Sequence, residues 1–248
     1  MEKKKKIVIF SGAGLDRESG VLTFRDCKDG LWNNHKIEDV ATPEGWRKDR
    51  AKVLEFYNER RRQMPEVEPN DGHRLIASLE KDYDVINLTQ NVSDLLERGG
   101  ATNVIHLHGE LTKARGSMYS HKSSPADQVY DIGYKDINIG DKCPVTDSQL
   151  RPHIVWFGEM PFGVQEGYAA IYEADYLIVI GTSLNIGYTL DMLAMAPDKC
   201  KIFYIDPQPS PILGKYTMKT VTHMKYGGSE GMAKFIEKLN ELETAKEA

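Results

Sequence analysis

Six short apolar runs, each bounded by turn-forming residues, constrain the fold of this chain more than any other feature. The runs are IVIF from residue 7, DVINLTQN from 84, VIHLHG from 104, HIVWFGE from 153, DYLIVIGTS from 175 and KIFYIDP from 201. Their hydrophobicity is continuous rather than alternating, which is typical of parallel strands covered on both faces. Patterns typical of helices lie between them or follow them, at 50–63, 72–81, 165–173 and 231–245. The sequence therefore predicts an α/β fold with a doubly wound parallel sheet.

The segment from 112 to 150 interrupts this alternation. It is rich in Gly, Pro, Ser and Asp and has no strong hydrophobic period. Long segments of this kind within a compact domain are usually functional. We therefore expect one domain over 1–248, with a helical insertion at about 29–80 and a smaller inserted lobe at about 112–150.

The composition limits the class of protein. With 248 residues, 40% of them hydrophobic, the chain can bury a large core, and its net charge of -5 argues against nucleic acid as a partner. The three cysteines, Cys27, Cys143 and Cys200, are too widely spaced for a disulfide framework and fit a reducing compartment. The apolar run at 7–10 is too short for a membrane span or a signal-peptide core. We expect a cytoplasmic protein with no membrane partner, and the sequence leaves the oligomeric state open.

The first apolar run leads into Gly12-Ala13-Gly14, where an α/β nucleotide fold has its phosphate-binding turn. Glycine lets the backbone approach a pyrophosphate, and the N-terminus of a following helix favours the anion. However, Gly20 comes six residues after Gly14, so the usual GxGxxG spacing is not met. Alone, the motif leaves two interpretations open, which are a nucleotide-binding turn and an ordinary tight turn.

Five segments that occur in one order favour a nucleotide-binding interpretation of this turn. They are GAGLDRESGVLTFRD at 12–26, TQNVSDLLERGG at 89–100, VIHLHGEL at 104–111, RPHIVWFGEMP at 151–161 and IGTSLN at 180–185. Together they resemble the sirtuin family of NAD-dependent protein-lysine deacylases, and in particular its bacterial short members. The resemblance implies a Rossmann-like enzyme that consumes NAD and an acyl-lysine protein or peptide. The products would be free lysine, nicotinamide and O-acyl-ADP-ribose.

The resemblance also implies roles for individual residues. His108 matches the family's base, since an ordinary imidazole with a pKa of about 6.5 can accept a proton near neutral pH. Asn91 would orient the reacting ribose, whereas His106 is expected to be a structural histidine bonded to a carbonyl group. The positions that match NAD contacts are Gly12, Ala13, Gly14, Arg25, Gln90, Asn91, Ser93, Gly181, Thr182, Ser183 and Asp206. The positions that match the wall of the acyl-lysine tunnel, where a peptide would add as a strand, are Val155, Phe157 and Gly158.

Tyr57 and Arg60 lie three residues apart in a predicted helix and so share a face. A Tyr-x-x-Arg pair recognises the acyl carboxylate in the sirtuin branch that removes succinyl and malonyl groups. A guanidinium fork suits such a carboxylate. The alternative is a solvated helix face on which the arginines pair with nearby glutamates.

One departure from the family's pattern concerns its structural zinc, which two pairs of cysteines usually hold. Gly116 stands where the first cysteine is expected, and Cys143 is the only thiol of that interval. With His121 it would supply at most two of the four ligands that a tetrahedral zinc site needs. We expect no structural zinc.

The other departures concern the nicotinamide pocket. Ser93 replaces an aspartate that binds the carboxamide in the family, and Asp16-Arg17 replaces a Ser-Ala pair beside that pocket. These two charges would narrow the pocket or form an internal pair. Two alternative functions therefore stay open beside the deacylase. One is a sensor that binds NAD or ADP-ribose with weak catalysis, and the other is an NAD hydrolase or ADP-ribosyltransferase that needs no acyl-lysine.

Overall fold

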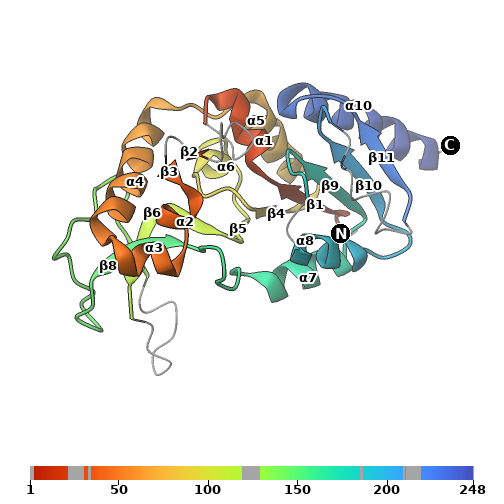
Figure 1. The fold of residues 1–248 in the computed structure, drawn as a ribbon. Coiled ribbons are helices and arrows are strands. Elements are labelled where there is room, and N and C mark those ends of the chain that lie inside the picture. Colours follow the sequence, from red (N-terminus) through yellow and green to blue (C-terminus); the bar gives the residue numbers. More distant parts are fainter. Residues whose placement is uncertain are drawn as a thin grey trace.

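A six-stranded parallel sheet forms the larger part of the molecule (Figure 1). The structure is a computed structural model that describes residues 3–21, 31–32, 35–118, 129–184, 187–208, 210 and 219–247. The strand order is β11-β10-β9-β1-β4-β5, and every pairing is parallel. The strands are β1 (Lys6–Ser11), β4 (Asp84–Thr89), β5 (Val104–His106), β9 (Tyr176–Ile180), β10 (Lys201–Ile205) and β11 (Val221–Met224). The predicted α/β fold with a doubly wound parallel sheet is confirmed.

Both faces of this sheet are buried, as its continuous hydrophobic strands require. In β1, Ile7 and Ile9 pack into one hydrophobic cluster, whereas Val8 and Phe10 pack into another. The helices with residues in the first cluster are α1 (Ala13–Asp16), α5 (Asp71–Ser78), α6 (Leu95–Arg98) and α10 (Gly228–Glu247). Those in the second are α7 (Val164–Tyr172) and α8 (Gly187–Ala194). No helix in the described ranges is long and apolar enough to cross a membrane.

A smaller lobe lies beside the sheet, at the β5 side in Figure 1. Its helices are α2 (Ile37–Val40), α3 (Pro43–Lys48) and α4 (Arg50–Gln63), and its antiparallel sheet has the order β7-β6-β8. These strands are β6 (Gly109–Gly116), β7 (Val129–Asp131) and β8 (Leu150–Ile154). One core of Trp46, Phe56, Tyr57, Leu111 and Trp156, among others, joins the helices to this sheet. The expected insertion as far as Val67 and the expected inserted lobe thus pack as one unit, whereas α5 at the end of that insertion packs in the first cluster of the main sheet.

The expectation was wrong for the run that starts at residue 153, because β8 belongs to the antiparallel sheet of the lobe. A continuous apolar run does not determine which sheet a strand joins: Ile154 and Trp156 are buried in the lobe core, whereas Phe157 is exposed. The remaining short elements are β2 (Leu31–Trp32), β3 (His35–Lys36) and the 3-10 turns Arg17–Ser19, Met64–Glu66 and Leu79–Lys81.

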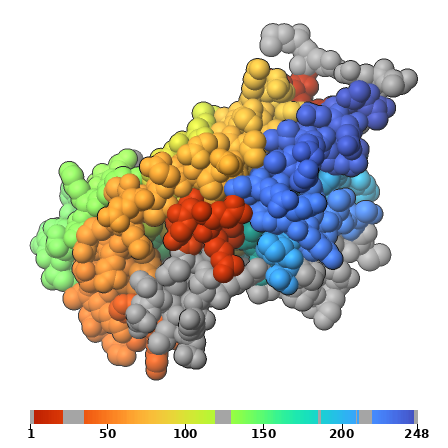
Figure 2. All heavy atoms as spheres, turned by 90° about the horizontal axis from the view of Figure 1, so that it is seen from above, coloured from red at the N-terminus to blue at the C-terminus, as the bar shows by residue number. Residues whose placement is uncertain are grey.

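The arrangement of the strands fixes where a site can form. Strand β1 lies between β9 and β4, so the strand order changes direction at β1: β4 and β5 lie on one side of it, and β9, β10 and β11 on the other. The carboxyl ends of β1, β4 and β9 lie side by side at one edge of the sheet. Ligands of open α/β sheets bind at such a position. On the face in Figure 2, the red segment that includes α1 lies between the orange helices of the lobe and the blue α10.

Candidate active site

Most of the predicted cofactor residues follow the strands that end at this edge. Gly12, Ala13 and Gly14 follow β1, whereas Gln90, Asn91 and Ser93 follow β4. Gly181, Thr182 and Ser183 follow β9, and Asp206 follows β10. Arg25 lies outside the described residues. Segments that are up to about 190 residues apart in the sequence therefore come together because parallel strands end side by side.

The glycines of the first turn are needed because two turns approach closely. The N–H groups of Gly12 and Gly14 donate to the carbonyl groups of Ile180 (3.0 Å) and Gly181 (2.8 Å). A Cβ atom on Gly12 would lie 2.7 Å from that of Thr182, and one on Gly14 would lie 2.7 Å from the Cα of Gly181. Gly181 itself has φ +63, which favours glycine. The tight-turn interpretation of this motif therefore explains its glycines without a ligand, and a nucleotide-binding role is additional to it.

Gln90 and Thr182 connect the ends of β4 and β9. The Thr182 hydroxyl donates to Gln90 Oε1 at 2.8 Å, and the Gln90 N–H donates to the carbonyl of Ser11 at 2.9 Å. Asp206 is buried at the end of β10 and accepts from the N–H of Gln208 at 2.9 Å. Thr182 and Asp206 thus hold polar groups in fixed positions at the edge where a cofactor would bind.

His108 lies in the turn between β5 and β6, and its hydrogen bonds define its tautomer. Its Nδ1 faces the carbonyl of Gln90 at 3.0 Å, so Nδ1 carries the proton. Nε2 then accepts from the hydroxyl of Tyr188, in α8, at 2.8 Å. Burial lowers the pKa of His108 to about 4, against a smaller opposing effect of the Gln90 carbonyl. The imidazole is therefore neutral at neutral pH and presents a lone pair at Nε2.

Tyr188 is a residue that the sequence did not identify. Burial raises the pKa of its hydroxyl to about 12, so the group is an O–H donor. It belongs to no motif, because its helix begins beyond the IGTSLN segment. His108 lies 80 positions earlier, so no sequence spacing relates the two residues. Only the packing of α8 against the sheet reveals the pair.

Asn91 lies at the centre of a buried polar cluster. Its Nδ2 donates to the carbonyl of Gly12 at 3.1 Å and to Asp16 Oδ1 at 2.6 Å. The Ser93 hydroxyl donates to Asp16 Oδ2 at 2.6 Å, and Nε2 of His73 lies 3.1 Å from Oδ1. The sequence allowed Asp16 and Arg17 to narrow the pocket or to pair with each other, but in the described residues Asp16 instead has Asn91, Ser93 and His73 as partners. No motif in the sequence indicated His73.

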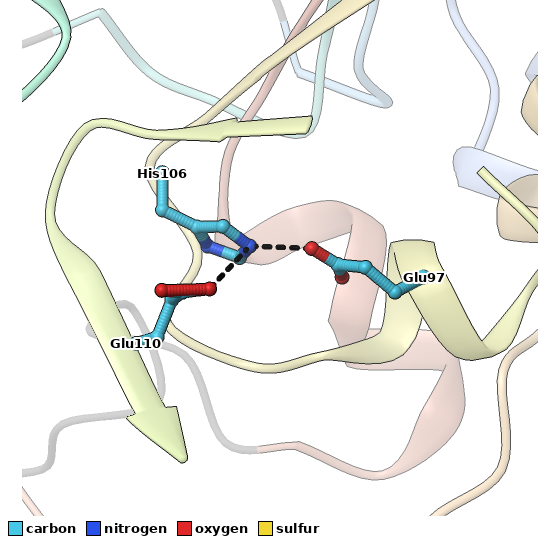
Figure 3. A group of neighbouring side chains, drawn as sticks. All are labelled: Glu97, His106 and Glu110. Carbon is cyan, nitrogen blue, oxygen red and sulfur yellow. Dashed lines mark hydrogen bonds and ion pairs between the residues drawn. The ribbon is translucent and has the colours of Figure 1, made fainter. Parts of the chain in front are cut away.

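His106, the residue two before His108, is bonded to a carbonyl as predicted: its Nδ1 lies 3.0 Å from the carbonyl oxygen of Asn91. Figure 3 shows that its Nε2 faces two carboxylates, at 2.8 Å from Glu97 and 3.7 Å from Glu110. Although burial favours the neutral form, the hydrogen bond with Glu97 and the charges of both glutamates raise the pKa of His106 above its ordinary value. The ligand atoms of the three residues lie within 4.8 Å of one another. A cation could bind there only after His106 released its proton.

Tyr57 and Arg60 both project from α4, and each has a partner within the lobe. Tyr57 is buried, and its hydroxyl accepts from Nε1 of Trp156 at 3.1 Å, while burial raises its pKa to about 12. Arg60 is half-buried, donates to the carbonyl of Phe56 at 2.6 Å, and stacks over the Phe56 ring at 3.3 Å. Since Trp156 lies next to Phe157, the structure brings Tyr57 to the segment predicted to bind a peptide.

That segment follows β8 and is partly open. The N–H of Val155 donates to the carbonyl of His108 at 2.9 Å, which fixes the segment beside the predicted base. The N–H of Phe157 donates to Ala41, and the Phe157 side chain is 53% exposed. Gly158 has φ +90 and is also exposed. An exposed aromatic side chain next to a left-handed glycine suits a surface that receives an extended chain.

The region where the sequence predicted the loss of zinc cysteines has polar contacts instead. A Cβ on Gly116 would lie 3.1 Å from that of Cys143 and 2.9 Å from the hydroxyl oxygens of Thr146 and Ser148. Burial raises the pKa of the Cys143 thiol, but hydrogen bonds from Thr146 and Tyr130 outweigh it and lower the value to about 7. Among the described residues, one thiol beside hydroxyl groups does not make a tetrahedral zinc site, and His121 lies outside the described residues.

Three kinds of comparison place the chain. The model of the Sir2 family matches residues 12–187. The NAD-dependent protein deacylase of Bacteroides thetaiotaomicron is 40% identical over 96% of this chain and 97% of its own length. The enzyme of the same name from Helicobacter pylori is 47% identical over 82% of this chain and 85% of its own length. Among solved structures, a Sir2 homologue bound to NAD has a TM-score of 0.80 at 32% identity, and covers 96% of this chain and 91% of its own. A mutant Sir2 homologue bound to ADP ribose has a TM-score of 0.81 at 31% identity, over 97% of this chain and 94% of its own.

The fold and the edge site together define an enzyme of the Rossmann-like, NAD-using class. Within that class, the chain belongs to the Sir2 family. The predictions of family, enzyme class and cofactor are thereby confirmed.

Proposed function

We propose that this chain removes acyl groups from lysine side chains of proteins, with NAD as the second substrate. The observation that carries the proposal is the state of His108. Its Nδ1–H is bonded to Gln90, and its Nε2 holds a lone pair at the edge where the sheet strands end. Such a group is unprotonated before each turnover, which is what removal of a proton from a ribose hydroxyl requires. Tyr188 must turn away from Nε2 when a substrate hydroxyl takes its place.

For NAD, we assign the positions predicted from the sequence, with the glycines of 12–14 and 181 near the phosphates, and Thr182 and Asp206 near the adenosine. Their support is their common place at the carboxyl edge beside β1, the switch point of the sheet. When bound, NAD supplies the ribose carbon that receives the acyl oxygen. Asn91 orients that ribose, and His108 accepts the proton.

For the protein substrate, we propose that an extended peptide carrying acyl-lysine lies along 155–158. The bond between Val155 and the His108 carbonyl keeps this strand next to the base. The free thiols Cys143 and Cys200 are both buried, which fits the cytoplasm as the place of action. Cytoplasmic proteins would then be the substrates.

We further propose a preference for succinyl and malonyl groups, read by Tyr57 and Arg60. The guanidinium of Arg60 is a planar fork of N–H donors, a geometry that suits a carboxylate, and it lies on α4 one turn from Tyr57. An unpaired acyl carboxylate buried in the lobe would cost several kcal/mol, and pairing with Arg60 offsets this. An acetyl group makes no such contact.

Succinyl-lysine and acetyl-lysine versions of one peptide, assayed with NAD by mass spectrometry, test both proposals. We expect nicotinamide, O-acyl-ADP-ribose and free lysine in equal amounts. We also expect a kcat/KM for desuccinylation about 10- to 100-fold above that for deacetylation, equivalent to about 1.4 to 2.8 kcal/mol. Arg60→Met should remove most of this ratio and keep deacetylation. Arg62→Met is the matched control, because Arg62 is exposed and pairs with Glu55 and Asp136.

Other outcomes separate the alternatives. Equal loss of both activities in Arg60→Met, or a wild-type preference for acetyl, refutes the acyl assignment while leaving the deacylase intact. Consumption of NAD without peptide indicates a hydrolase or ADP-ribosyltransferase. Binding of NAD without nicotinamide release indicates a sensor.

We also propose that the lobe folds without zinc, since Gly116 and Thr146 stand beside Cys143 where further thiols would be needed. Metal analysis of the purified protein should find no stoichiometric zinc, and a chelator should leave the melting temperature unchanged. One zinc per chain with a lower melting temperature after chelation would refute this.

A further inference from the structure

Helix α1 carries a buried carboxylate whose surroundings are unusual. Asp16 is 3% exposed, and in the described part of the chain no lysine or arginine pairs with it. Its partners are the Asn91 amide, the Ser93 hydroxyl and the His73 ring. A buried carboxylate is expensive unless donors surround it, so this group is held by three hydrogen bonds instead of an ion pair.

The tautomer of His73 follows from its other contact. The N–H of Asn70 donates to Nδ1 of His73 at 3.2 Å, so the proton of a neutral ring lies on Nε2 and points at Asp16. His73 is fully buried, and therefore its position is set by the packing of α5. His73 therefore holds the Asp16 carboxylate in position, and the same carboxylate accepts from the Asn91 amide.

The orientation of the Asn91 amide follows from the same contacts. Its two neighbours, Asp16 Oδ1 and the Gly12 carbonyl, are both acceptors, so only the NH₂ side of the amide can face them. Both Nδ2 hydrogens are then used. No group in the described ranges donates to Oδ1 of Asn91, which leaves that oxygen as the acceptor that the side chain presents. Without a carboxylate at Asp16, one of the two restraints on this orientation is lost.

The contact between Asp16 and Ser93 joins two segments 77 positions apart. The Ser93 oxygen lies 2.6 Å from the carboxylate, so a carboxylate attached at position 93 would occupy nearly the same space. Two carboxylates at once would place like charges in a buried site, which is strongly unfavourable.

We propose that Asp16 is a positioning residue for Asn91, and that Asp16 and Ser93 form an exchangeable pair of which only one member can carry the charge. The Asp16 carboxylate fixes the Asn91 amide with its oxygen presented to the ligand, and it places one negative charge beside the site that receives NAD. This inference rests on the proposed function, because it is the reaction of NAD at Asn91 that the orientation serves.

A reciprocal swap tests the pair. Asp16→Ser should lower kcat for deacylation by about 100-fold, a loss like that of one preorganised group in an active site. Ser93→Asp should lower it similarly through repulsion. The double variant Asp16→Ser/Ser93→Asp should recover kcat to within about 5-fold of wild type, because the carboxylate then reaches Asn91 from the other side. Two independent defects would not give this rescue, since the losses at independent sites add.

Two further variants keep the test independent of folding and of the deacylase assignment. Asp16→Asn keeps the shape and removes the charge, and should lower kcat by about 10-fold with KM little changed. Glu18→Gln, in the next turn and bonded to Ser229, is the matched control and should match wild type. Solvent exchange of the Asn91 side-chain amide, followed by ¹⁵N NMR without NAD, should be faster in Asp16→Ser and restored in the double variant.

The result that overturns the inference is a double variant no better than its worse single variant, or an Asn91 amide whose exchange does not change in Asp16→Ser. If wild type lacks deacylase activity, the proposed function fails. Two measurements still decide the inference in that case: exchange of the Asn91 amide by NMR and affinity for NAD by calorimetry. Both are made in wild type, the two single variants of the swap and the double variant.

Discussion

Two histidines separated by one residue have the same anchor and pKa values shifted in opposite directions. His106 and His108 each donate Nδ1–H to a backbone carbonyl at 3.0 Å, and the two carbonyls belong to the adjacent residues Asn91 and Gln90. They differ at Nε2, where His106 faces Glu97 and Glu110, and His108 faces the hydroxyl of Tyr188. The pKa is raised in His106 and lowered to about 4 in His108.

Because both rings are buried, the carboxylates beside Nε2 of His106 account for the opposite shifts of the two pKa values. Desolvation disfavours the charged form of each, and only carboxylates overcome it. His106 therefore favours its protonated form more than an ordinary histidine does, and it connects the Asn91 loop to Glu97. His108 stays neutral and keeps a lone pair for chemistry. The strand end thus contains one structural histidine and one that we propose as the base.

The largest expected effect comes from removing the proposed base. His108→Ala should lower kcat by about 1,000-fold or more, because a general base and its hydrogen bonds are lost together. Binding of NAD, measured by calorimetry, should stay within about 3-fold, since uniform binding does not depend on a base. Compared with His108→Ala, the variant His106→Asn should lose far less activity and more stability. A His108→Ala variant with near-normal turnover would remove His108 from the mechanism.

The second effect is on stability in acid. His108 has a folded pKa of about 4, below its ordinary value of 6.5, so the unfolded chain binds a proton first as pH falls. Its contribution is therefore fully present above about pH 6.5 and is lost as pH falls toward 4, by at most about 3 kcal/mol. Urea unfolding of wild type and His108→Gln at pH 7 and pH 5 measures this. We expect wild type to lose more stability than the variant, and equal losses would contradict the buried neutral state.

The contribution of His106 to the free energy of unfolding should depend on pH in the opposite sense. The pKa of His106 is raised, so its contribution is present below the unfolded value near 6.5 and is lost as pH rises through the folded value. Glu97 is 40% exposed, and its pair with His106 is partly screened. Glu97→Gln should therefore lower the free energy of unfolding by about 1 kcal/mol at pH 5.5 and by less at pH 9. Glu237→Gln, which breaks an exposed pair with Lys234, is the control and should change little. A larger loss at pH 9 than at pH 5.5 would refute the raised pKa of His106.

Much of this arrangement follows from local sequence, and the rest does not. The strand runs, the helices at 50–63 and 165–173, and the order of motifs along the edge were all predictable, because burial and turn chemistry are written in neighbouring residues. The proposed base, His108, rests on a resemblance to a family. The place of the run at 153 was not, since continuous hydrophobicity is the same in either sheet.

The partners of the site residues were not predictable, since they join distant segments. Asp16 and Ser93 are 77 positions apart, and Gln90 and Thr182 are 92 positions apart. Taken separately, Asp16 and Ser93 each depart from the family's pattern, and Thr182 fits an ordinary turn. Only the meeting of the strand ends shows that the charge missing at Ser93 stands at Asp16.

Tyr188 gives the smallest expected effect and the sharpest test of the comparison. Its hydroxyl donates to Nε2 of His108 at 2.8 Å in the free enzyme, where the substrate hydroxyl must later bind. An interaction that is absent from the reacting complex cannot speed the reaction, so Tyr188→Phe should change kcat by less than about 3-fold. The variant should also let the pKa of His108 rise, because the donor that favours its neutral form is gone. NMR titration of the His108 ring measures this shift. A loss of kcat near 100-fold would instead make Tyr188 part of the proton path, and the neutrality of His108 would then depend on a reacting group.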